Sequence, residues 1–505
     1  MTLATLWRWR AALMATGVGM LAALLRLGSL SQPHALVFDE VFYARGAYSL
    51  TVLGFEGDWT GDDSAFVDGD YSGLTTEGDF VVHPMVGKLL IALGIELVGV
   101  TPVGWRIVGA VLGVALAVMV ALIARRLFRS TVWGAVAGIL IAVDGEAIVL
   151  ARTALLDGFL AFFVVAGFGL LVIDRDRTRA LLEREAAADR AALGMGPEGF
   201  LPGGGPRTGI RWWRLAAIVA FALAASTKWS GLYFAAAFLV LSVVWDAVAR
   251  RELGYDRWLA GAFVRAVPAA VATVVTTLVV YVASWANWFL TDGSYARRWA
   301  EEHPGEGATW LPDALNSLLH YHQQMWTFHT GLTTEHNYMS NPWLWLIQWR
   351  PTAFYFEDVP DADCGAERCV SAIHALGNPL IWWLATAALV WALWRVLRHR
   401  DMLALTVSMG VLAGWVPWLP YAYRTIFTFY SVAFAPFMVL TLVWALRRIA
   451  QPERLAGAWS RRGVLIVGIT LAAILVVAAF FVPLWVGSPV PFRYWQLHMW
   501  LPTWV

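Results

Sequence analysis

Long apolar stretches separated by short polar or basic segments dominate the chain. Each stretch is close to the ~20 residues that a helix needs to cross the hydrocarbon core of a bilayer. The pattern predicts an all-α polytopic membrane protein with about eleven transmembrane helices. The stretches lie at roughly 10–30, 105–124, 131–150, 155–173, 214–227, 231–248, 262–285, 379–397, 402–420, 426–446 and 463–486.

The composition agrees with a bilayer environment. Hydrophobic residues make up 59% of the 505 residues, charged residues make up 14%, and the mean hydropathy is +0.60. Soluble proteins average about 25% charged residues, so a soluble enzyme is excluded. The net charge of +1 says nothing about partners, and no nucleic-acid partner is expected.

The distribution of basic residues orients the chain in the membrane. Short cytoplasmic loops are enriched in Lys and Arg, and the arginines gather in the loops of one side under the eleven-span prediction. We therefore expect a cytoplasmic N-terminus, an extracytoplasmic C-terminus and two large extracytoplasmic loops, 31–104 and 286–378. Only the short turn 227–230 separates the fifth and sixth predicted spans. If these two spans were one helix, the number of spans would be even instead of odd. The first apolar stretch is long enough to be a retained helix rather than a cleaved signal.

Three segments outside the spans are assigned from composition. The short, glycine-broken segment 83–100 predicts an interfacial helix lying along the membrane; a twelfth span is the alternative. The mixed-charge and then Gly/Pro-rich segment 174–214 predicts a short cytoplasmic helix and a flexible linker. The two cysteines, Cys364 and Cys369, lie in the second large loop. A disulfide is favoured over a metal site, which needs further ligands nearby.

Charged residues gather near the outer ends of the predicted spans. A charge at a helix centre costs ~2.5–3.5 kcal/mol on insertion scales, so such residues usually face a partner, a cavity or water. The structural alternative is that Arg152 pairs with Asp157 to tie two helices together, and that Lys228 only extends to the interface. The charged residues near this boundary are Asp39, Glu40, Asp144, Glu146, Arg152, Asp157, Lys228 and Arg424.

Carboxylates beside several cations at one membrane surface favour group transfer from a phosphate-bearing lipid. Guanidinium and ammonium groups hold a phosphate and stabilise the charge that develops as it leaves. A carboxylate accepts the proton of the incoming hydroxyl. The adjacent Asp39 and Glu40, directly after the first span, are the leading candidates for that role.

Six motifs, in this order, resemble those of the protein O-mannosyltransferases, most closely their actinobacterial members. The ordered set covers most of the membrane core, whereas one Asp-Glu pair alone says little. The motifs are FDEVFY at 38–43, HPMVGK at 83–88, ARTALLDG at 151–158, TKWSG at 227–231, HNYMSNPW at 336–343 and RTIFTFY at 424–430.

The resemblance implies a GT-C glycosyltransferase that uses no cofactor or metal. Such an enzyme transfers mannose, with inversion, from polyprenyl-phosphate-mannose to Ser or Thr of proteins that cross the cytoplasmic membrane. Eukaryotic members carry a β-rich lumenal domain that the loop 286–378 is too short to contain. The loop itself, or a partner such as the Sec translocon, is therefore expected to select the acceptor.

The resemblance also implies residue roles. Asp39 is expected to be the general base, and Glu40 to orient the acceptor or the sugar. The expected contacts to the donor phosphate are Arg152, Arg424, Lys88 and Lys228, and the expected sugar or acceptor pocket contains His83, Asp157, His336, Tyr338 and Trp343.

Two other functions are compatible with parts of the pattern. A glycosyltransferase of the same architecture that acts on a cell-wall glycan or lipid would need the same carboxylates and cations. A polytopic transporter could use Asp39, Arg152 and Asp157 as coupling groups, but transporter sites usually lie near the bilayer midplane and within repeated halves. These charges lie near one surface, and the sequence contains no evident repeat.

Overall fold

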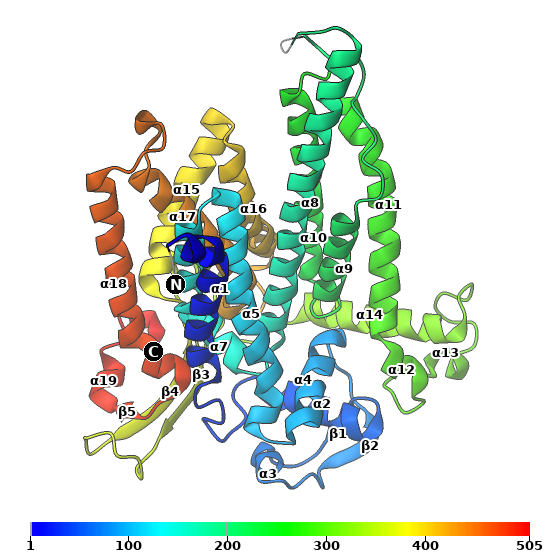
Figure 1. Ribbon diagram of the computed structural model, residues 1–505. Helices are drawn as coiled ribbons and strands as arrows, with labels where there is room; N and C mark the ends of the chain where they lie inside the picture. Colours follow the sequence, from blue (N-terminus) through cyan, green and yellow to red (C-terminus); the bar gives the residue numbers. More distant parts are fainter. Residues whose placement is uncertain (1–2, 197–198) are drawn as a thin grey trace.

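Long helices lying side by side form most of the computed structural model, which describes residues 3–196 and 199–505 (Figure 1). Within the described residues, eight helices are long and apolar enough to cross a bilayer. They are α1 (Leu3–Leu27), α5 (Pro102–Phe128), α8 (Leu156–Ala192), α10 (Gly231–Glu252), α11 (Trp258–Ser284), α15 (Pro379–His399), α16 (Met402–Trp415) together with the following 3-10 helix η2 (Val416–Tyr421), and α18 (Arg461–Val486).

The predicted count of eleven spans is not confirmed. A ninth span is counted if α6 (Thr131–Ala142) and α7 (Gly145–Arg152) are taken together, although 60° separates their axes. Asp144 marks the break because its side chain accepts a backbone hydrogen bond from the first turn of α7, as a helix N-cap does. The remaining two stretches form α9 (Trp212–Ala225, 14 residues) and α17 (Ala435–Ala450, 16 residues). At 1.5 Å per residue, both are shorter than a ~30 Å hydrocarbon core.

The helices differ in how deeply they are packed. α17 is buried along nearly its whole length and contacts α15, α16, α18 and α6. α11 lies at one edge of the molecule (Figure 1), packs against α9 and α10, and buries only Gly261 and Ala262. Its remaining apolar surface therefore faces the membrane.

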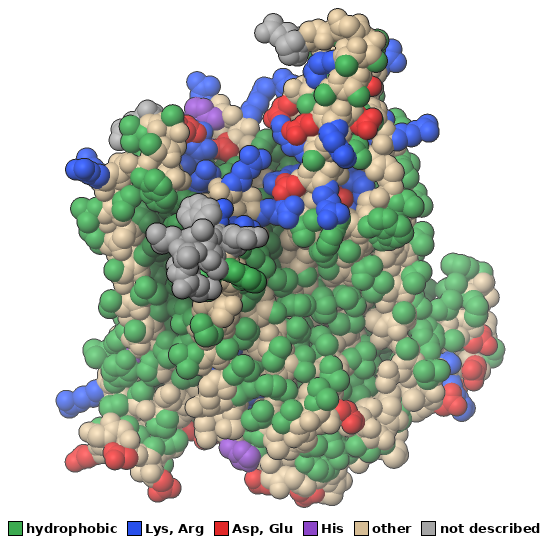
Figure 2. Space-filling model, viewed as in Figure 1, with side chains coloured by type: hydrophobic (Ala, Val, Ile, Leu, Met, Phe, Trp, Pro, Cys, Tyr) green, Lys and Arg blue, Asp and Glu red, His purple; other side chains and the backbone are tan. Residues whose placement is uncertain are grey.

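Basic side chains gather at one end of the bundle. Figure 2 shows most Lys and Arg of this face at the upper end, above a broad apolar belt. α5, α10, α15 and α17 each carry basic residues in the last turn, where positive charge also complements the helix dipole. This is the clustering that the positive-inside pattern predicts for one membrane face.

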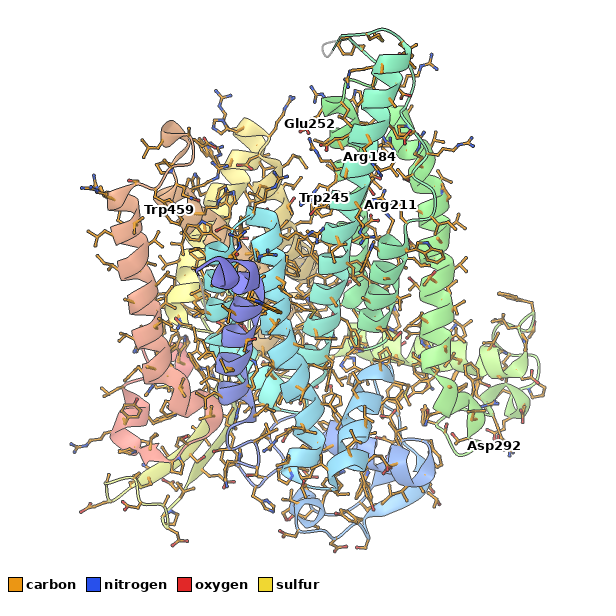
Figure 3. The ribbon with its side chains drawn as sticks, viewed as in Figure 1. Arg184, Arg211, Trp245, Glu252, Asp292 and Trp459 are labelled. Atoms are coloured by element: carbon orange, nitrogen blue, oxygen red, sulfur yellow. A yellow bond between two sulfur atoms is a disulfide. The ribbon has the colours of Figure 1, made fainter. Side chains whose placement is uncertain are left out.

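The segment 174–214 differs from the prediction of a separate short helix and linker. Its first part is the continuation of α8, which runs for 37 residues without a break. Arg211, near the end of the segment, forms ion pairs with Asp174 of α8 and Asp246 of α10, and Figure 3 shows it well below the upper end of α8. The segment is therefore tied to the bundle at this point.

The predicted fold class, a helical multi-pass membrane protein, is confirmed, and the two large loops add small sheets to it. The loop 31–104 forms α2 (Glu40–Leu53), β1 (Gly57–Trp59), α3 (Asp63–Val67), β2 (Leu74–Gly78) and α4 (Val86–Val98). The loop 286–378 forms α12 (Ala286–Leu290), α13 (Trp299–Glu302), α14 (Asp313–Gly331), η1 (Pro342–Ile347), β3 (Thr352–Asp358) and β4 (Cys369–Ala375).

Antiparallel pairing joins β1 to β2, and joins β3, β4 and the short β5 (Val490–Pro491) in that order. The rest of the chain after α16 forms η3 (Thr428–Ala433), η4 (Glu453–Leu455), α19 (Phe492–Gln496) and η5 (Pro502–Trp504). Outer segments distant in sequence therefore meet at one end of the bundle (Figure 1).

The helix predicted within 83–100 is α4. With 13 residues it is about 20 Å long and too short to span, which removes the alternative of a twelfth transmembrane helix. One face packs on α2 and α5, whereas Leu93, Leu97 and Val98 are exposed. This exposed apolar face is the surface that an interfacial helix needs.

Candidate active site

Asp39 lies immediately before α2, on a backbone that neighbouring aromatic rings hold in place. The preceding residue, Phe38, has a φ of 49°, a left-handed conformation that bulky residues rarely adopt. Its ring stacks on Phe354 at 4.8 Å and makes edge contacts with Phe427 and Phe429. Asp39 occupies the N-cap position of α2, yet its side chain makes no capping hydrogen bond. The carboxylate is therefore available to a ligand.

The Glu40 side chain, in contrast to that of Asp39, is bonded within the protein. Its carboxylate is fully buried and accepts two hydrogen bonds from the Arg106 guanidinium, at 2.8 and 2.7 Å. The backbone N–H groups of Val37 and Ala154 donate to the same carboxylate. The predicted contact with acceptor or sugar is not supported by this placement, because the acceptor positions of Glu40 are already used within the protein.

Arg106 was missed by the sequence reasoning. Besides Glu40, it donates to the carbonyl oxygens of Leu30, Pro33 and Ala35 and so shapes the chain leading to Asp39. The available signal was an arginine inside the apolar stretch 105–124, since a charge there requires a partner.

Arg152 does not reach the candidate site. Its guanidinium donates hydrogen bonds to backbone carbonyls in the last turn of α1, just after α1 and at the end of α18, which satisfies carbonyl groups that the end of α1 leaves free. The alternative prediction, an Arg152–Asp157 pair, is wrong because Asp157 pairs with Lys228. The accepting carbonyls belong to Leu25, Arg26, Gly28, Ser29 and Val486.

Lys228, just after α9, and Asp157, in the first turn of α8, form a buried ion pair. The ammonium lies 2.9 and 3.0 Å from the two carboxylate oxygens and 4.4 Å from the centre of the Tyr430 ring. Lys228 belongs to the short turn between α9 and α10, and the pair brings two of the sequence motifs together. Lys228 thus has a specific partner and does not simply extend to the interface.

A cavity of about 560 Å³ opens beside this ion pair. Its polar wall contains His83, Lys228 and Arg424, whereas Leu232, Leu278, Trp326 and Trp418 contribute to its apolar wall. His83 lies in the turn before α4, and Lys228 in the turn between α9 and α10. The other residues come from α10, α11, α14 and the segments around η2. The cavity therefore joins a cationic end to an apolar side, as a lipid phosphate requires.

Arg424 is buried at the polar end of this cavity. Its guanidinium lies 5.9 Å from the Tyr421 ring, and its Nε is buried without a hydrogen bond. Among the described residues, no carboxylate forms an ion pair with it. A buried unpaired guanidinium is costly unless an anion fills the site, so Arg424 indicates an anionic ligand.

Electrostatics distinguish the carboxylate from the histidines nearby. Burial raises the pKa of Asp39 from 3.8 to about 6, with Lys228 opposing and Asp157 adding to the rise. Burial, together with Lys228, holds the pKa of His83 well below its usual range, and burial lowers the pKa of His329 to about 4. At neutral pH, Asp39 is therefore ionised and both stacked histidines are neutral.

Lys88 supports the site from outside the cavity. Its ammonium forms a buried ion pair with Glu56 at 2.7 Å and donates a hydrogen bond to the carbonyl of His83 at 2.9 Å. Its predicted contact with phosphate is not supported by this position. Lys88 instead fixes the turn that carries His83.

Of the predicted acceptor residues His336, Tyr338 and Trp343, only His336 contacts the segment that carries Asp39. The His336 ring makes an edge contact with Phe38 at 6.1 Å, and Tyr338 lies beside Arg350. Trp343 is 60% exposed and contacts Trp415, at a distance from the cavity lining. The structure therefore brings His336 close to the candidate base and leaves Trp343 apart from it.

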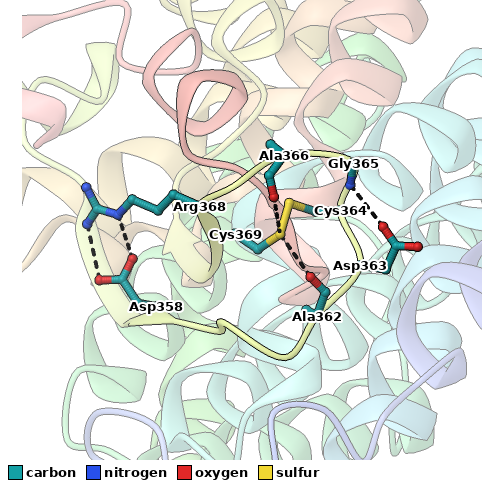
Figure 4. Close-up of a disulfide and its surroundings, with 8 residues drawn as sticks. All are labelled: Asp358, Ala362, Asp363, Cys364, Gly365, Ala366, Arg368 and Cys369. Carbon is teal, nitrogen blue, oxygen red and sulfur yellow. Dashed lines mark hydrogen bonds and ion pairs between the residues drawn. A yellow bond between two sulfur atoms is a disulfide. The ribbon is translucent and has the colours of Figure 1, made fainter.

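The disulfide prediction is confirmed. Cys364 and Cys369 are bonded and close a small loop between β3 and β4 (Figure 4). Arg368 forms an ion pair with Asp358 across the same hairpin. In the part of the chain that the structure describes, no group of three or more His, Cys, Asp or Glu side chains is placed to hold a metal ion.

A multi-pass helical bundle with a carboxylate, two cations and a part-apolar cavity at one end is the arrangement expected of a membrane enzyme that acts on a phosphate-bearing lipid. The comparisons with known proteins name the family. A model described as "Dolichyl-phosphate-mannose-protein mannosyltransferase" matches residues 99–181, and one described as "C-terminal four TMM region of protein-O-mannosyltransferase" matches residues 314–504. The chain belongs to the protein O-mannosyltransferase family.

Similar proteins and a solved structure agree with this family. The polyprenol-phosphate-mannose–protein mannosyltransferase of Mycobacterium tuberculosis is 37% identical over 486 residues, covering 95% of this chain and 88% of the relative. The enzyme of the same name from Mycolicibacterium smegmatis is 36% identical over 502 residues, covering 98% and 93%. The Saccharomyces cerevisiae Pmt1–Pmt2 complex bound to the sugar donor shares the fold, with a TM-score of 0.72, 15% identity, and coverage of 100% of this chain and 94% of that one.

Proposed function

We propose that this protein transfers mannose from polyprenyl-phosphate-mannose to Ser or Thr hydroxyls of secreted or membrane proteins, with inversion. The reaction takes place at the outer face of the cytoplasmic membrane, opposite the basic end of the bundle. The observation that carries the proposal is the buried Arg424, which pairs with no carboxylate of the described residues, in a cavity whose other side is apolar. The names of the relatives support this donor and this class of acceptor.

Arg424 and Lys228 bind the donor phosphate in this proposal. Both line the polar end of the cavity, and Arg424 offers N–H donors that no carboxylate of the described residues takes up. Lys228 keeps its ion pair with Asp157, which holds the ammonium in place. Charge-assisted hydrogen bonds to the phosphate grow stronger as the sugar–phosphate bond opens and negative charge develops on the leaving oxygen.

The apolar wall binds the first part of the polyprenyl chain. Leu232, Leu278 and Trp418 line it, and Trp326 of α14 closes one side. α11 borders the cavity and exposes its apolar surface to the membrane. The lipid chain therefore extends from the cavity into the bilayer without crossing a polar barrier.

Asp39 is the general base of the proposed reaction. The acceptor hydroxyl oxygen attacks the anomeric carbon as the bond from that carbon to the phosphate oxygen breaks. Asp39 takes the hydroxyl proton in the same step, and polyprenyl phosphate leaves with the bonding electrons. A carboxylate with a pKa of about 6 is a better proton acceptor than an ordinary aspartate and is still ionised at pH 7.

The surrounding residues hold this geometry. Glu40 and Arg106 fix the backbone next to Asp39, and the neutral His83 lies in the cavity wall where the sugar would bind. His336 and Tyr338 lie on the acceptor side. The two cations supply the charge that the leaving phosphate needs, so the reaction is proposed to need no cofactor. A translocon that delivers unfolded acceptor chains is a proposed partner.

The test is transfer of radiolabelled mannose from polyprenyl-phosphate-mannose to a Thr-containing peptide in membranes. Asp39→Asn is expected to abolish labelling while the protein remains inserted, and Asp68→Asn, an exposed aspartate of the same loop, serves as the matched control with wild-type rates. The wild-type rate is expected to be the same in EDTA.

The other outcomes separate the alternatives. Donor turnover without peptide labelling would indicate a glycan or lipid acceptor. No turnover at all would favour the transporter function. Near-normal labelling by Asp39→Asn would refute the assignment of the base.

A further inference from the structure

The acceptor-side loop, defined as residues 332–341, lies next to the proposed base. His336 of this loop contacts Phe38, the residue before Asp39, and also packs against Phe427 at 5.1 Å. The loop forms no regular helix or strand, and residues 333–337 are exposed. A substrate that approaches Asp39 from this side meets the loop first, so the position of the loop decides where an acceptor hydroxyl can lie.

The segment 425–426 bonds the loop near its beginning and its end. The Thr425 N–H donates to the Leu332 carbonyl at 3.2 Å, and the Ser340 N–H donates to the Ile426 carbonyl at 2.8 Å. The Thr425 hydroxyl also donates to the Thr334 carbonyl, and within the loop the Met339 N–H donates to the His336 carbonyl at 2.9 Å. At Asn337 and Tyr338, the contact from outside the loop comes from Arg350. Arg350 donates to the Asn337 carbonyl from Nε at 3.1 Å and from Nη2 at 2.6 Å, and its guanidinium lies 5.3 Å from the centre of the Tyr338 ring.

The other side of Arg350 contacts the segment 502–505. Nη1 donates to the carbonyl oxygens of Thr503 at 2.7 Å and Val505 at 3.0 Å. One guanidinium therefore joins three backbone carbonyls from two separate segments. Arginine suits this geometry because its planar group carries five N–H donors on three nitrogens, whereas lysine presents all its donors from one atom.

The segment 502–505 is itself firmly anchored. Trp504 is 1% exposed, and its indole N–H donates to the Gln348 carbonyl at 2.8 Å. Its ring packs against Phe481 of α18. The segment thus provides a fixed support, and Arg350 transmits that support to the acceptor-side loop.

We propose that Arg350 is a positioning residue for the acceptor polypeptide. By clamping Asn337 and Tyr338 to the segment 502–505, it keeps the acceptor-side loop against the chain that carries Asp39, so that a bound Ser or Thr hydroxyl meets the carboxylate. The residues that line the cavity that holds the donor do not include Arg350. This inference rests on the proposed function.

The experiment compares steady-state transfer by wild type, Arg350→Gln and Arg350→Lys in detergent, with polyprenyl-phosphate-mannose and a Thr-containing peptide. Arg350→Gln is expected to raise the KM for peptide about tenfold, as expected from the loss of roughly one charge-assisted hydrogen bond, and to leave the KM for donor unchanged. The KM of Arg350→Lys for peptide is expected to lie between those of wild type and Arg350→Gln. Arg368→Gln, which removes an exposed arginine of the neighbouring β3–β4 hairpin, is the control and should match wild type.

KM does not depend on the amount of folded enzyme, so a loss of stability alone would lower the maximal rate and leave both KM values unchanged. That result, or a parallel rise of both KM values, would overturn the inference.

If Arg350→Gln does not fold, Trp504→Phe takes its place. It keeps the packed ring, loses the bond to Gln348, and is expected to raise the peptide KM by a smaller factor; an unchanged value overturns the inference. A wild-type protein that turns over donor without labelling peptide refutes the proposed acceptor instead.

Discussion

Replacing Arg424 by Gln tests the donor site most directly. The guanidinium is buried at the polar end of the cavity, and none of the described carboxylates pairs with it. If it binds the donor phosphate, the variant loses at least one charge-assisted hydrogen bond, which is worth about 1.5–3 kcal/mol. Since each 1.36 kcal/mol is a factor of ten in rate, kcat/KM for the donor should fall about 10- to 150-fold.

The same environment predicts an unusual effect on stability. Removing one member of a buried ion pair leaves its partner unpaired and destabilises a protein strongly, but Arg424 has no such partner to leave behind. Thermal unfolding of Arg424→Gln without substrate should therefore occur at or above the wild-type temperature. Lost activity together with retained stability is the expected signature of a residue that serves a ligand.

Arg152→Gln is the matched control, because both arginines were predicted from the sequence to contact phosphate. Arg152 donates to several backbone carbonyls around the end of α1, so its loss should lower the unfolding temperature and reduce activity only through the amount of folded protein. A kcat/KM for Arg424→Gln within about threefold of wild type would refute the phosphate assignment, and so would an unfolding temperature that falls as far as that of the control.

Three further predictions concern Asp39 and the Lys228–Asp157 ion pair. Because burial raises the pKa of Asp39 to about 6, the transfer rate should fall as pH decreases through about 6, where Asp39 becomes protonated and loses its capacity as a base; a rate that is constant from pH 5 to 8 would contradict this. Between 3.8 and about 6 the native protein holds the Asp39 proton more tightly than the unfolded chain, so this residue's contribution to stability falls as pH rises through that window. Asp39→Asn should therefore be at least as stable as wild type at pH 7, as measured by thermal unfolding. Lys228→Met should destabilise the protein by about 3–5 kcal/mol, because it leaves Asp157 buried and unpaired; the double variant Lys228→Met/Asp157→Leu should recover most of the stability and none of the activity.

Much of the candidate site could be predicted from residue types and their order along the chain. Asp39, Lys228 and Arg424 each follow or precede an apolar stretch, and positions next to a span lie at the membrane surface whatever the packing. The apolar stretches also predicted where helices form, and the clustering of arginines agrees with Figure 2. These features depend on local hydrophobicity and on the length of a helix that crosses a bilayer, which the sequence contains directly.

The partners of the charged residues could not be predicted in the same way. Asp157 pairs with Lys228, 71 residues away, and Glu40 pairs with Arg106, 66 residues away. A charge in an apolar span requires some partner, but hydropathy does not say which one, because the choice depends on how helices pack. For this reason Arg152 and Lys88 were expected at the phosphate, whereas the structure uses both of them inside the protein.

The sequence by itself therefore determined that this chain is a multi-pass membrane protein, the motifs by which it resembles its family, and the surface at which its chemistry is expected. Only the tertiary structure decided which cations remain free for a ligand. Arg424 and Arg152 look alike as arginines beside apolar stretches, and they differ only in the groups that surround them. The end of α1 surrounds Arg152 with carbonyl oxygens, while the cavity beside Lys228 leaves Arg424 with a buried positive charge and no partner among the described residues.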